Sequence, residues 1–287
     1  MDNYEIINHL GKGSFGQVYL AQSSDPNIED VFAIKIIPKD KLITQINYGR
    51  MLRDIDIPRY IKRINRGCHK NVICIVEALE SETEIWIVYE FINGPTLNNF
   101  QIADEIGDVE AIEVMYTIAS TLQYLHSIGI RHRDIKPANI VLNKEKIENL
   151  ENESIEIIKY NPVLIDFDLA CIVDHPKYGC YNRRLGTPNY LPPEIWLNEE
   201  NIDYTKSDIY SLGVTFYFML NNRHLPYQAN IDQDLKELVL YNEPIPSRYG
   251  ERDINKMIMR MINKDPEDRP SLDEILEILQ NVIERLS

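Results

Sequence analysis

Three polar residues in the stretch from Arg131 to Asn143 have types and a spacing that suit phosphoryl transfer. Asp134 comes two residues before Lys136 and five residues before Asn139. The aspartate can orient an attacking hydroxyl, and the lysine can neutralise charge on a moving phosphoryl group. The asparagine can bind a hard cation through its amide oxygen. Each residue alone would be typical of a solvated turn, so only the combination indicates this chemistry.

The flanking residues predict how this stretch is held. Residues 109–127 are expected to form a helix, and residues 140–142 read as a short buried strand. The apolar residues at helical spacing are Met115, Ile118, Leu122 and Leu125. We therefore place the polar cluster on a loop between a helix and a strand, where catalytic groups are commonly mounted.

The string H-R-D-x-K-x-x-N, from His132 to Asn139, resembles the catalytic loop of eukaryotic-type protein kinases. This resemblance implies an α+β, bilobal protein-kinase-like fold in which residues 1–287 form one catalytic domain. The small β-rich N-lobe would cover about residues 1–91, the hinge about 90–96, and the larger, mainly helical C-lobe about 97–287. The implied activity is that of a protein kinase dependent on ATP and Mg²⁺.

Two N-terminal segments match the nucleotide-binding parts of that family. Gly11, Gly13 and Gly16 belong to a G-x-G-x-x-G-x-V pattern with strand-like runs on both sides, which predicts a hairpin and not a strand followed by a helix. Lys35, in the strand-like VFAIKII, would hold the α- and β-phosphates. The residues that the resemblance implies for ATP binding are Gly11, Lys12, Gly13, Ser14, Phe15, Gly16, Val18, Ala33, Lys35, Tyr89, Glu90, Ile92 and Val141.

The resemblance also assigns the segment between the lobes. Tyr89 is the gatekeeper and should narrow the pocket behind the adenine. Glu90 and Ile92 would bond the adenine through their backbone groups, and Thr96 stands where the family often has an acid near the ribose.

Lys35 is expected to pair with an acid on the following helix. The family offset of close to twenty residues points to Asp54, with Asp56 as an alternative. Pro58 is expected to end or kink this helix, because proline lacks the N–H that a helix interior needs.

The strand-like VLIDFDLA delivers Asp166, which with Asn139 is the implied pair of Mg²⁺ ligands. Phe167 would pack against His132. Asp168 stands where the family has a glycine. Replacing glycine by aspartate reduces the backbone freedom of this loop. This substitution supports a second hypothesis, a pseudokinase that acts as a nucleotide-binding or protein-interaction module.

Further matches concern the architecture of the C-lobe. Thr187 would bridge the catalytic aspartate and lysine, and with Lys136 it favours serine and threonine as acceptors. Asp208 would hold the backbone of the catalytic loop. Glu194 is expected to form an ion pair with Arg269.

Arg133 belongs to a class of kinases whose activation segment is ordered by pairing an arginine with a phosphorylated residue. Residues 168–186 contain neither serine nor threonine. We therefore expect activity without loop phosphorylation, with Tyr178 or Tyr181 as the alternative switch.

Composition limits the partners and the compartment. The net charge of −15 argues against binding to nucleic acid or to an anionic membrane. No signal peptide or membrane span is expected, so the protein should be intracellular, either cytoplasmic or nuclear. The expected partner is a protein substrate with a Ser/Thr acceptor. A separate regulatory protein is a second candidate partner.

Two local features remain open. The acidic insert at residues 143–161 is expected to be a hairpin extension or a mobile segment. The cysteines lack CxxC or metal-ligand spacing and are expected to be free thiols, with a Cys171–Cys180 disulfide as an alternative. The four cysteines are Cys68, Cys74, Cys171 and Cys180.

Overall fold

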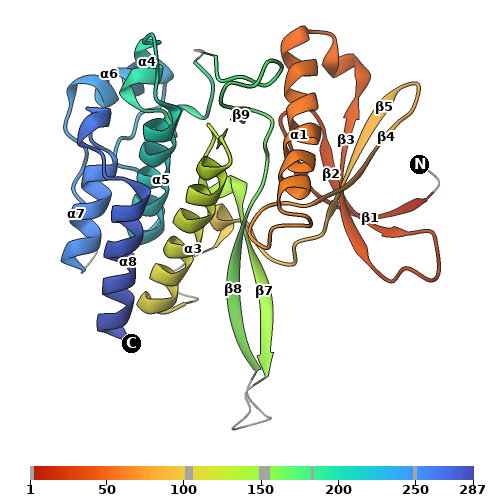
Figure 1. The fold of residues 1–287 in the computed structure, drawn as a ribbon, viewed down its shortest axis with the longest axis horizontal. Helices are drawn as coiled ribbons and strands as arrows, with labels where there is room; N and C mark the ends of the chain where they lie inside the picture. Colours follow the sequence, from red (N-terminus) through yellow and green to blue (C-terminus); the bar gives the residue numbers. More distant parts are fainter. Residues whose placement is uncertain (1–2, 101–105, 149–155, 182–183, 248–250) are drawn as a thin grey trace. The chain divides into compact units, whose positions relative to one another are not determined.

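The computed structural model describes two compact units (Figure 1). The first consists of Met1–Asn93 and Ile165–Asp168, and the second of Gly94–Leu164 and Leu169–Ser287. The described residues are 3–100, 106–148, 156–181, 184–247 and 251–287.

The first unit is built on an antiparallel sheet with the strand order β1-β2-β3-β5-β4. Its strands are β1 (Tyr4–Lys12), β2 (Gln17–Ser23), β3 (Val31–Pro38), β4 (Ile75–Glu80) and β5 (Glu84–Glu90). A core cluster on one face contains Ala21, Ile34 and Val88. Because successive side chains of a strand alternate between the faces, Lys35 of β3 points to the other face.

Helix α1 (Gln45–Ile64) crosses the same unit and begins at Thr44, whose hydroxyl accepts from the backbone of Asn47. Of the two outcomes expected at Pro58, an end or a kink, the first does not occur, because α1 continues through Pro58 to Ile64. Proline cannot donate to the carbonyl four residues earlier, which is that of Asp54. The Tyr89 hydroxyl of β5 donates to this carbonyl oxygen instead, at 3.2 Å.

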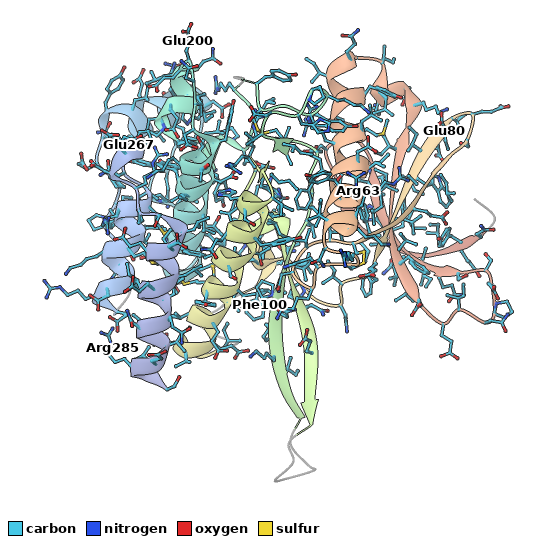
Figure 2. The ribbon with its side chains drawn as sticks, in the orientation of Figure 1. Arg63, Glu80, Phe100, Glu200, Glu267 and Arg285 are labelled. Carbon is cyan, nitrogen blue, oxygen red and sulfur yellow. A yellow bond between two sulfur atoms is a disulfide. The ribbon has the colours of Figure 1, made fainter. Side chains whose placement is uncertain are left out.

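The second unit is mainly helical. Helix α3 (Asp108–Ser127) packs against α8 (Leu272–Leu286), and α5 (Tyr204–Leu220) packs against α7 (Arg252–Met261), as Figure 1 shows. Arg285, which Figure 2 labels, lies near the end of α8. It pairs with Glu251 at 2.8 Å and with Asp253 at 3.1 Å. The shorter helices are α4 (Pro193–Leu197) and α6 (Asp232–Tyr241).

Two antiparallel strand pairs complete the second unit. Strands β6 (Ile130–Arg131) and β9 (Cys171–Ile172) pair beside the catalytic-loop sequence. Strands β7 (Ile140–Glu148) and β8 (Glu156–Leu164) form the long hairpin seen in Figure 1. The insert at residues 143–161 is therefore a hairpin extension, and its residues 149–155 lie outside the described part of the chain.

The expectation of four free thiols is wrong, because the cysteines form the disulfides Cys68–Cys74 and Cys171–Cys180. Their Cα atoms are 5.5 Å and 5.1 Å apart, within the usual range for disulfides. Chain reversals between the partners bring them together, and sequence spacing alone does not reveal such folding. In the part of the chain that the structure describes, no helix is long and apolar enough to cross a bilayer.

Candidate active site

In the second unit, Asp134, Lys136 and Thr187 form a closed triangle of hydrogen bonds. The Thr187 hydroxyl donates to Asp134 Oδ1 at 2.7 Å. Lys136 Nζ donates to Asp134 Oδ2 and to Thr187 Oγ1, both at 2.7 Å. The carboxylate is thus held at both oxygens, beside a positive charge, and only 6% of Asp134 is exposed. Such a group can orient a hydroxyl and receive its proton.

Asn139 reinforces this arrangement from the same loop. Its side-chain nitrogen donates to the backbone oxygen of Asp134 at 2.9 Å and to Oδ2 at 3.0 Å. Both bonds use the amide nitrogen and so turn the amide oxygen away from Asp134. That oxygen is a suitable ligand for a hard cation such as Mg²⁺.

The catalytic loop is fixed by Asp208 of the buried helix α5. Its carboxylate accepts from the backbone amides of His132 at 2.9 Å and Arg133 at 2.8 Å, and from His126 Nε2 at 2.9 Å. Burial would raise the pKa of Asp208, but the hydrogen bond and charge of His126 lower it below its usual value. Arg133 has a φ of 67°, an unfavourable angle for a non-glycine residue that these bonds help to maintain.

A buried ion pair fixes helix α4. Arg269 Nη1 and Nη2 donate to the two carboxylate oxygens of Glu194 at 2.7 Å and 2.8 Å. The Ser207 hydroxyl donates to the same carboxylate at 2.9 Å. The ion pair expected between Glu194 and Arg269 is therefore present, with bidentate geometry.

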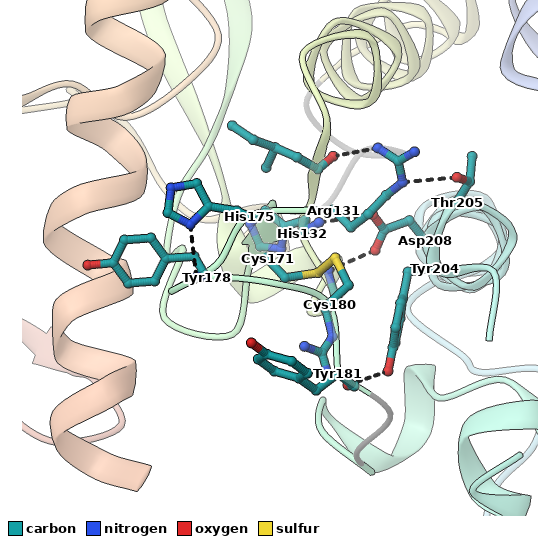
Figure 3. The surroundings of a disulfide bond; sticks show 12 residues. Arg131, His132, Cys171, His175, Tyr178, Cys180, Tyr181, Tyr204, Thr205 and Asp208 are labelled. Atoms are coloured by element: carbon teal, nitrogen blue, oxygen red, sulfur yellow. Dashed lines mark hydrogen bonds between the residues drawn. A yellow bond between two sulfur atoms is a disulfide. The ribbon is translucent and has the colours of Figure 1, made fainter. Parts of the chain in front are cut away.

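The Cys171–Cys180 disulfide closes a loop beside the catalytic-loop backbone (Figure 3). Cys171 of β9 lies opposite Arg131 of β6, one residue before His132. The amide of Ile172 donates to the Tyr178 carbonyl at 2.8 Å, which closes the loop a second time. The loop from Cys171 to Cys180 is therefore closed by a covalent bond and by a backbone hydrogen bond, and the pairing of β9 with β6 holds it beside Arg131.

The aromatic residues of this region separate the two candidate tyrosine switches. Tyr178 is 7% exposed, whereas Tyr181 is 53% exposed and is accessible to a modifying enzyme. The Tyr204 hydroxyl donates to the Tyr181 carbonyl at 2.7 Å (Figure 3). The guanidinium of Arg133 lies over the Tyr204 ring, 4.5 Å from its centroid.

In the first unit, Lys35 pairs with Asp54. Lys35 Nζ lies 2.6 Å from Asp54 Oδ2 and 3.6 Å from Asp166 Oδ1. Asp56, the alternative partner, instead lies 3.9 Å from Arg59. Burial alone would lower the pKa of Lys35, but the carboxylates of Asp54 and Asp166 raise it above its usual value, so the ammonium stays charged.

The glycine-rich segment forms the hairpin turn between β1 and β2. The Gly13 amide donates to the Gly16 carbonyl at 2.9 Å. A Cβ on Gly13 would come within 3.1 Å of Lys35 Cε, and one on Gly16 would lie 2.1 Å from the Ile36 carbonyl oxygen. The absence of side chains thus lets the turn lie close to Lys35.

The last two residues of strand β5, Tyr89 and Glu90, each have a polar group whose hydrogen-bonding role is already set. Burial raises the pKa of Tyr89 well above its usual value, and the carboxylates of Asp54 and Asp166 add to this, so its hydroxyl stays a donor. The Glu90 amide already donates to the Cys74 carbonyl at 3.0 Å. A contact from the Glu90 backbone to adenine would therefore use its carbonyl oxygen.

The pairing of strands gives the positions of several other residues that the sequence predicted for ATP binding. Val18 lies opposite Lys35 across β2 and β3, and Ala33 lies opposite Tyr89 across β3 and β5. In the second unit, Val141 forms a bridge with Thr96. His132 and Phe167 are both fully buried.

Sequence reasoning missed Arg50, which is the partner of Asp168. Arg50 Nη2 lies 2.5 Å from Asp168 Oδ2, and the Asp168 side chain is 1% exposed. Burial and the neighbouring Asp166 raise the pKa of Asp168 to about 7, and Arg50 opposes this shift. A signal was available, because Arg50 precedes Asp54 by four residues and so occupies the same helix face.

Residues 4–279 match the family model described as the protein kinase domain, and the chain therefore belongs to the protein kinase family. Its fold agrees, with a sheet-based first unit and a mainly helical second unit. A putative serine/threonine-protein kinase of Acanthamoeba polyphaga mimivirus is 36% identical over 240 residues, covering 80% of this chain and 79% of the viral protein.

Plant kinases are also similar to this chain. CBL-interacting protein kinase 2 of Oryza sativa subsp. japonica is 27% identical, and CBL-interacting serine/threonine-protein kinase 13 of Arabidopsis thaliana is 30% identical. Each alignment covers 96% of this chain but only 57% and 51% of the two plant proteins. The chain thus spans about half the length of these relatives. The names of these kinases do not favour the pseudokinase hypothesis.

Proposed function

We propose that this chain is a serine/threonine protein kinase that transfers the γ-phosphoryl group of ATP to a serine or threonine of a protein substrate. The hydrogen-bonded triangle of Asp134, Lys136 and Thr187 carries this proposal. It combines a carboxylate for the acceptor hydroxyl, a cation for the phosphoryl group and a threonine that is typical of Ser/Thr-directed kinases. Serine/threonine kinases among the relatives support it.

In the proposed reaction, the acceptor hydroxyl is oriented by Asp134, which also takes its proton. Lys136 balances the negative charge on the transferred group. Little covalent chemistry is required of the protein, because phosphoryl transfer is accelerated mainly by positioning and by charge stabilisation.

The proposed nucleotide contacts follow from the first unit. Lys35, held by Asp54, would bind the α- and β-phosphates, and the turn containing Gly13 and Gly16 would lie over them. Val18 and Ala33 would contact the adenine, together with Val141 of the second unit. The backbone of Glu90 and Ile92 would provide its hydrogen bonds.

Mg²⁺ is the proposed cofactor, with Asp166 and Asn139 as its ligands. A carboxylate and an amide oxygen fit the preference of this cation for hard oxygen ligands. The bound cation would neutralise charge on the phosphates. In the protein, the hydrogen bonds of the Asn139 nitrogen to Asp134 would keep the amide oxygen available.

We propose a protein substrate, a separate regulatory protein and an intracellular location. The substrate is a protein, and the plant relatives, whose names describe them as CBL-interacting, are consistent with a separate regulatory protein. An intracellular location suits an enzyme that uses ATP, whereas two disulfides are more typical of oxidising compartments. Microscopy of the tagged chain in cells will distinguish an intracellular location from an oxidising compartment.

The activity is tested with the purified chain, Mg²⁺, labelled ATP and a mixed library of Ser, Thr and Tyr peptides. We expect phosphoserine and phosphothreonine in the wild type, and Asp134→Asn should abolish transfer while it still binds nucleotide. An inactive wild type that binds ATP would support the pseudokinase hypothesis, and mainly phosphotyrosine would contradict the proposed acceptor.

A further inference from the structure

We propose that Arg50 and Asp168 form a positioning pair that holds helix α1 and the glycine-rich turn ready for ATP without phosphorylation. This inference rests on the proposed kinase function and concerns how its nucleotide-binding groups are kept assembled. Neither residue would contact the transferred phosphoryl group. Both would act through Lys35, Asp54 and the turn.

The first argument is the burial of a charged side chain at an unusual place. Asp168 follows Asp166 by two residues, where the family has glycine, and its side chain is 1% exposed. A buried carboxylate is strongly destabilising unless it is paired. Arg50 supplies that partner at 2.5 Å, with only 23% of its own side chain exposed. The substitution for glycine is thus matched by a specific cation.

The second argument is the position of Arg50 on helix α1. Residues four apart lie on one face of a helix, so Arg50 and Asp54 project from neighbouring turns on the same side. Asp54 binds Lys35 at 2.6 Å, and Arg50 binds Asp168 at 2.5 Å. The helix therefore has two adjacent polar attachments, and it cannot rotate away without breaking both.

The third argument is the contact between Arg50 and the tip of the glycine-rich turn. Its guanidinium lies 4.4 Å from the centroid of the Phe15 ring. Its Nη2 also donates to the Ser14 hydroxyl at 3.3 Å. One side chain thus connects the turn, helix α1 and the segment that contains Asp166.

These contacts need no modification to form. A phosphorylated side chain can order a segment by pairing with arginine, but its charge depends on another enzyme. Residues 168–186 provide neither serine nor threonine for such a modification. Asp168 is part of the chain itself, so its contact with Arg50 needs no other enzyme to form.

The test is steady-state kinetics of Arg50→Met, Asp168→Asn and the double variant, with ATP and peptide varied separately. We expect kcat/KM for ATP to fall by on the order of 100-fold in each single variant. The double variant should be little worse than Arg50→Met alone, because Asp168→Asn removes an interaction that Arg50→Met has already removed. Additive losses would overturn the proposed coupling.

The separate Michaelis constants distinguish positioning from loss of folded protein. Partial unfolding would lower the apparent kcat and leave both KM values unchanged. We expect the KM for ATP to rise and the KM for the peptide to stay the same, because the pair attaches groups of the nucleotide site. An unchanged KM for ATP would overturn the inference.

Two further variants and one treatment complete the design. Arg50→Lys keeps the charge and should recover part of the activity, whereas Arg59→Met, which alters an exposed arginine of the same helix, should behave as wild type. Phosphatase-treated wild type should stay active. Loss of its activity, or an Arg59→Met defect equal to that of Arg50→Met, would overturn the proposal. An inactive untreated wild type would instead contradict the proposed kinase function.

Discussion

The Tyr89 hydroxyl donates a hydrogen bond of 3.2 Å to the backbone oxygen of Asp54, the carbonyl that Pro58 cannot serve. A side chain of strand β5 thereby replaces a helix hydrogen bond at the residue that pairs with Lys35. This contact explains how α1 tolerates an internal proline next to a functional side chain.

Tyr89→Phe should destabilise the chain through this carbonyl. Removing the hydroxyl leaves a buried acceptor without this donor, which costs about 1–3 kcal/mol in the free energy of unfolding. Pro58→Ala supplies an N–H to the same carbonyl, so Tyr89→Phe should cost less in that background. Denaturant titrations of the two single variants and the double variant measure this coupling. Equal losses in both backgrounds would show that Tyr89 and Pro58 act independently.

Thr187→Val should lower kcat with little effect on the KM for ATP. The substitution keeps a similar shape and removes the hydroxyl that bonds both Asp134 and Lys136. A misplaced carboxylate should reduce turnover by on the order of 100-fold. Thr187→Ser, which keeps the hydroxyl, is the matched control and should retain most activity. A valine variant as fast as wild type would argue against the triangle as the catalytic arrangement.

Asp208 should make stability depend on pH in the acidic range. Burial opposes its ionisation, but His126 lowers its folded pKa below the usual value. Its stabilising contribution is therefore fully present above the unfolded pKa of about 3.9 and is lost as the pH falls through the folded value. Asp208→Asn should cost about 1.5–3 kcal/mol in the free energy of unfolding near pH 7, and less below about pH 4.

Thermal or denaturant unfolding of wild type and Asp208→Asn at pH 7 and pH 3 gives this comparison. Asp234→Asn changes an exposed carboxylate of α6 and serves as the control, with no such pH-dependent difference expected. A gap between wild type and Asp208→Asn that is the same at both pH values would contradict the assignment.

Loss of the Cys171–Cys180 disulfide should loosen the segment that precedes Thr187. Its cysteines are nine residues apart, and closing such a loop contributes about 2.5 kcal/mol in the chain-entropy description. A Cys171→Ser/Cys180→Ser double variant should melt at a lower temperature and have a lower kcat than wild type under non-reducing conditions. The corresponding Cys68/Cys74 double variant tests whether the effect is specific to this loop. Unchanged melting and turnover would contradict a structural role.

The contiguous motifs could be predicted because their residues lie close together in the sequence. The spacing of Asp134, Lys136 and Asn139 indicated a catalytic loop, and the apolar run around Lys35 indicated a strand, which β3 is. The glycine pattern between two strand-like runs indicated a hairpin, and the β1–β2 turn is one. In each case a local periodicity or a short spacing carried the information.

Partners distant in the sequence could be identified only after the chain had folded. Asp54 and Asp56 were both candidates for Lys35, and the direction each faces on α1 decides between them, since two residues turn a helix by more than half a circle. Arg50 and Asp168 are 118 residues apart, so the spacing of Arg50 to Asp54 indicates a shared helix face but does not indicate Asp168 as the partner. The sequence predicted an end or a kink of α1 at Pro58, because it does not show that a tyrosine from β5 donates to the Asp54 carbonyl. Local chemistry can be read along the chain, whereas the pairing of buried charges and backbone groups depends on which elements pack together.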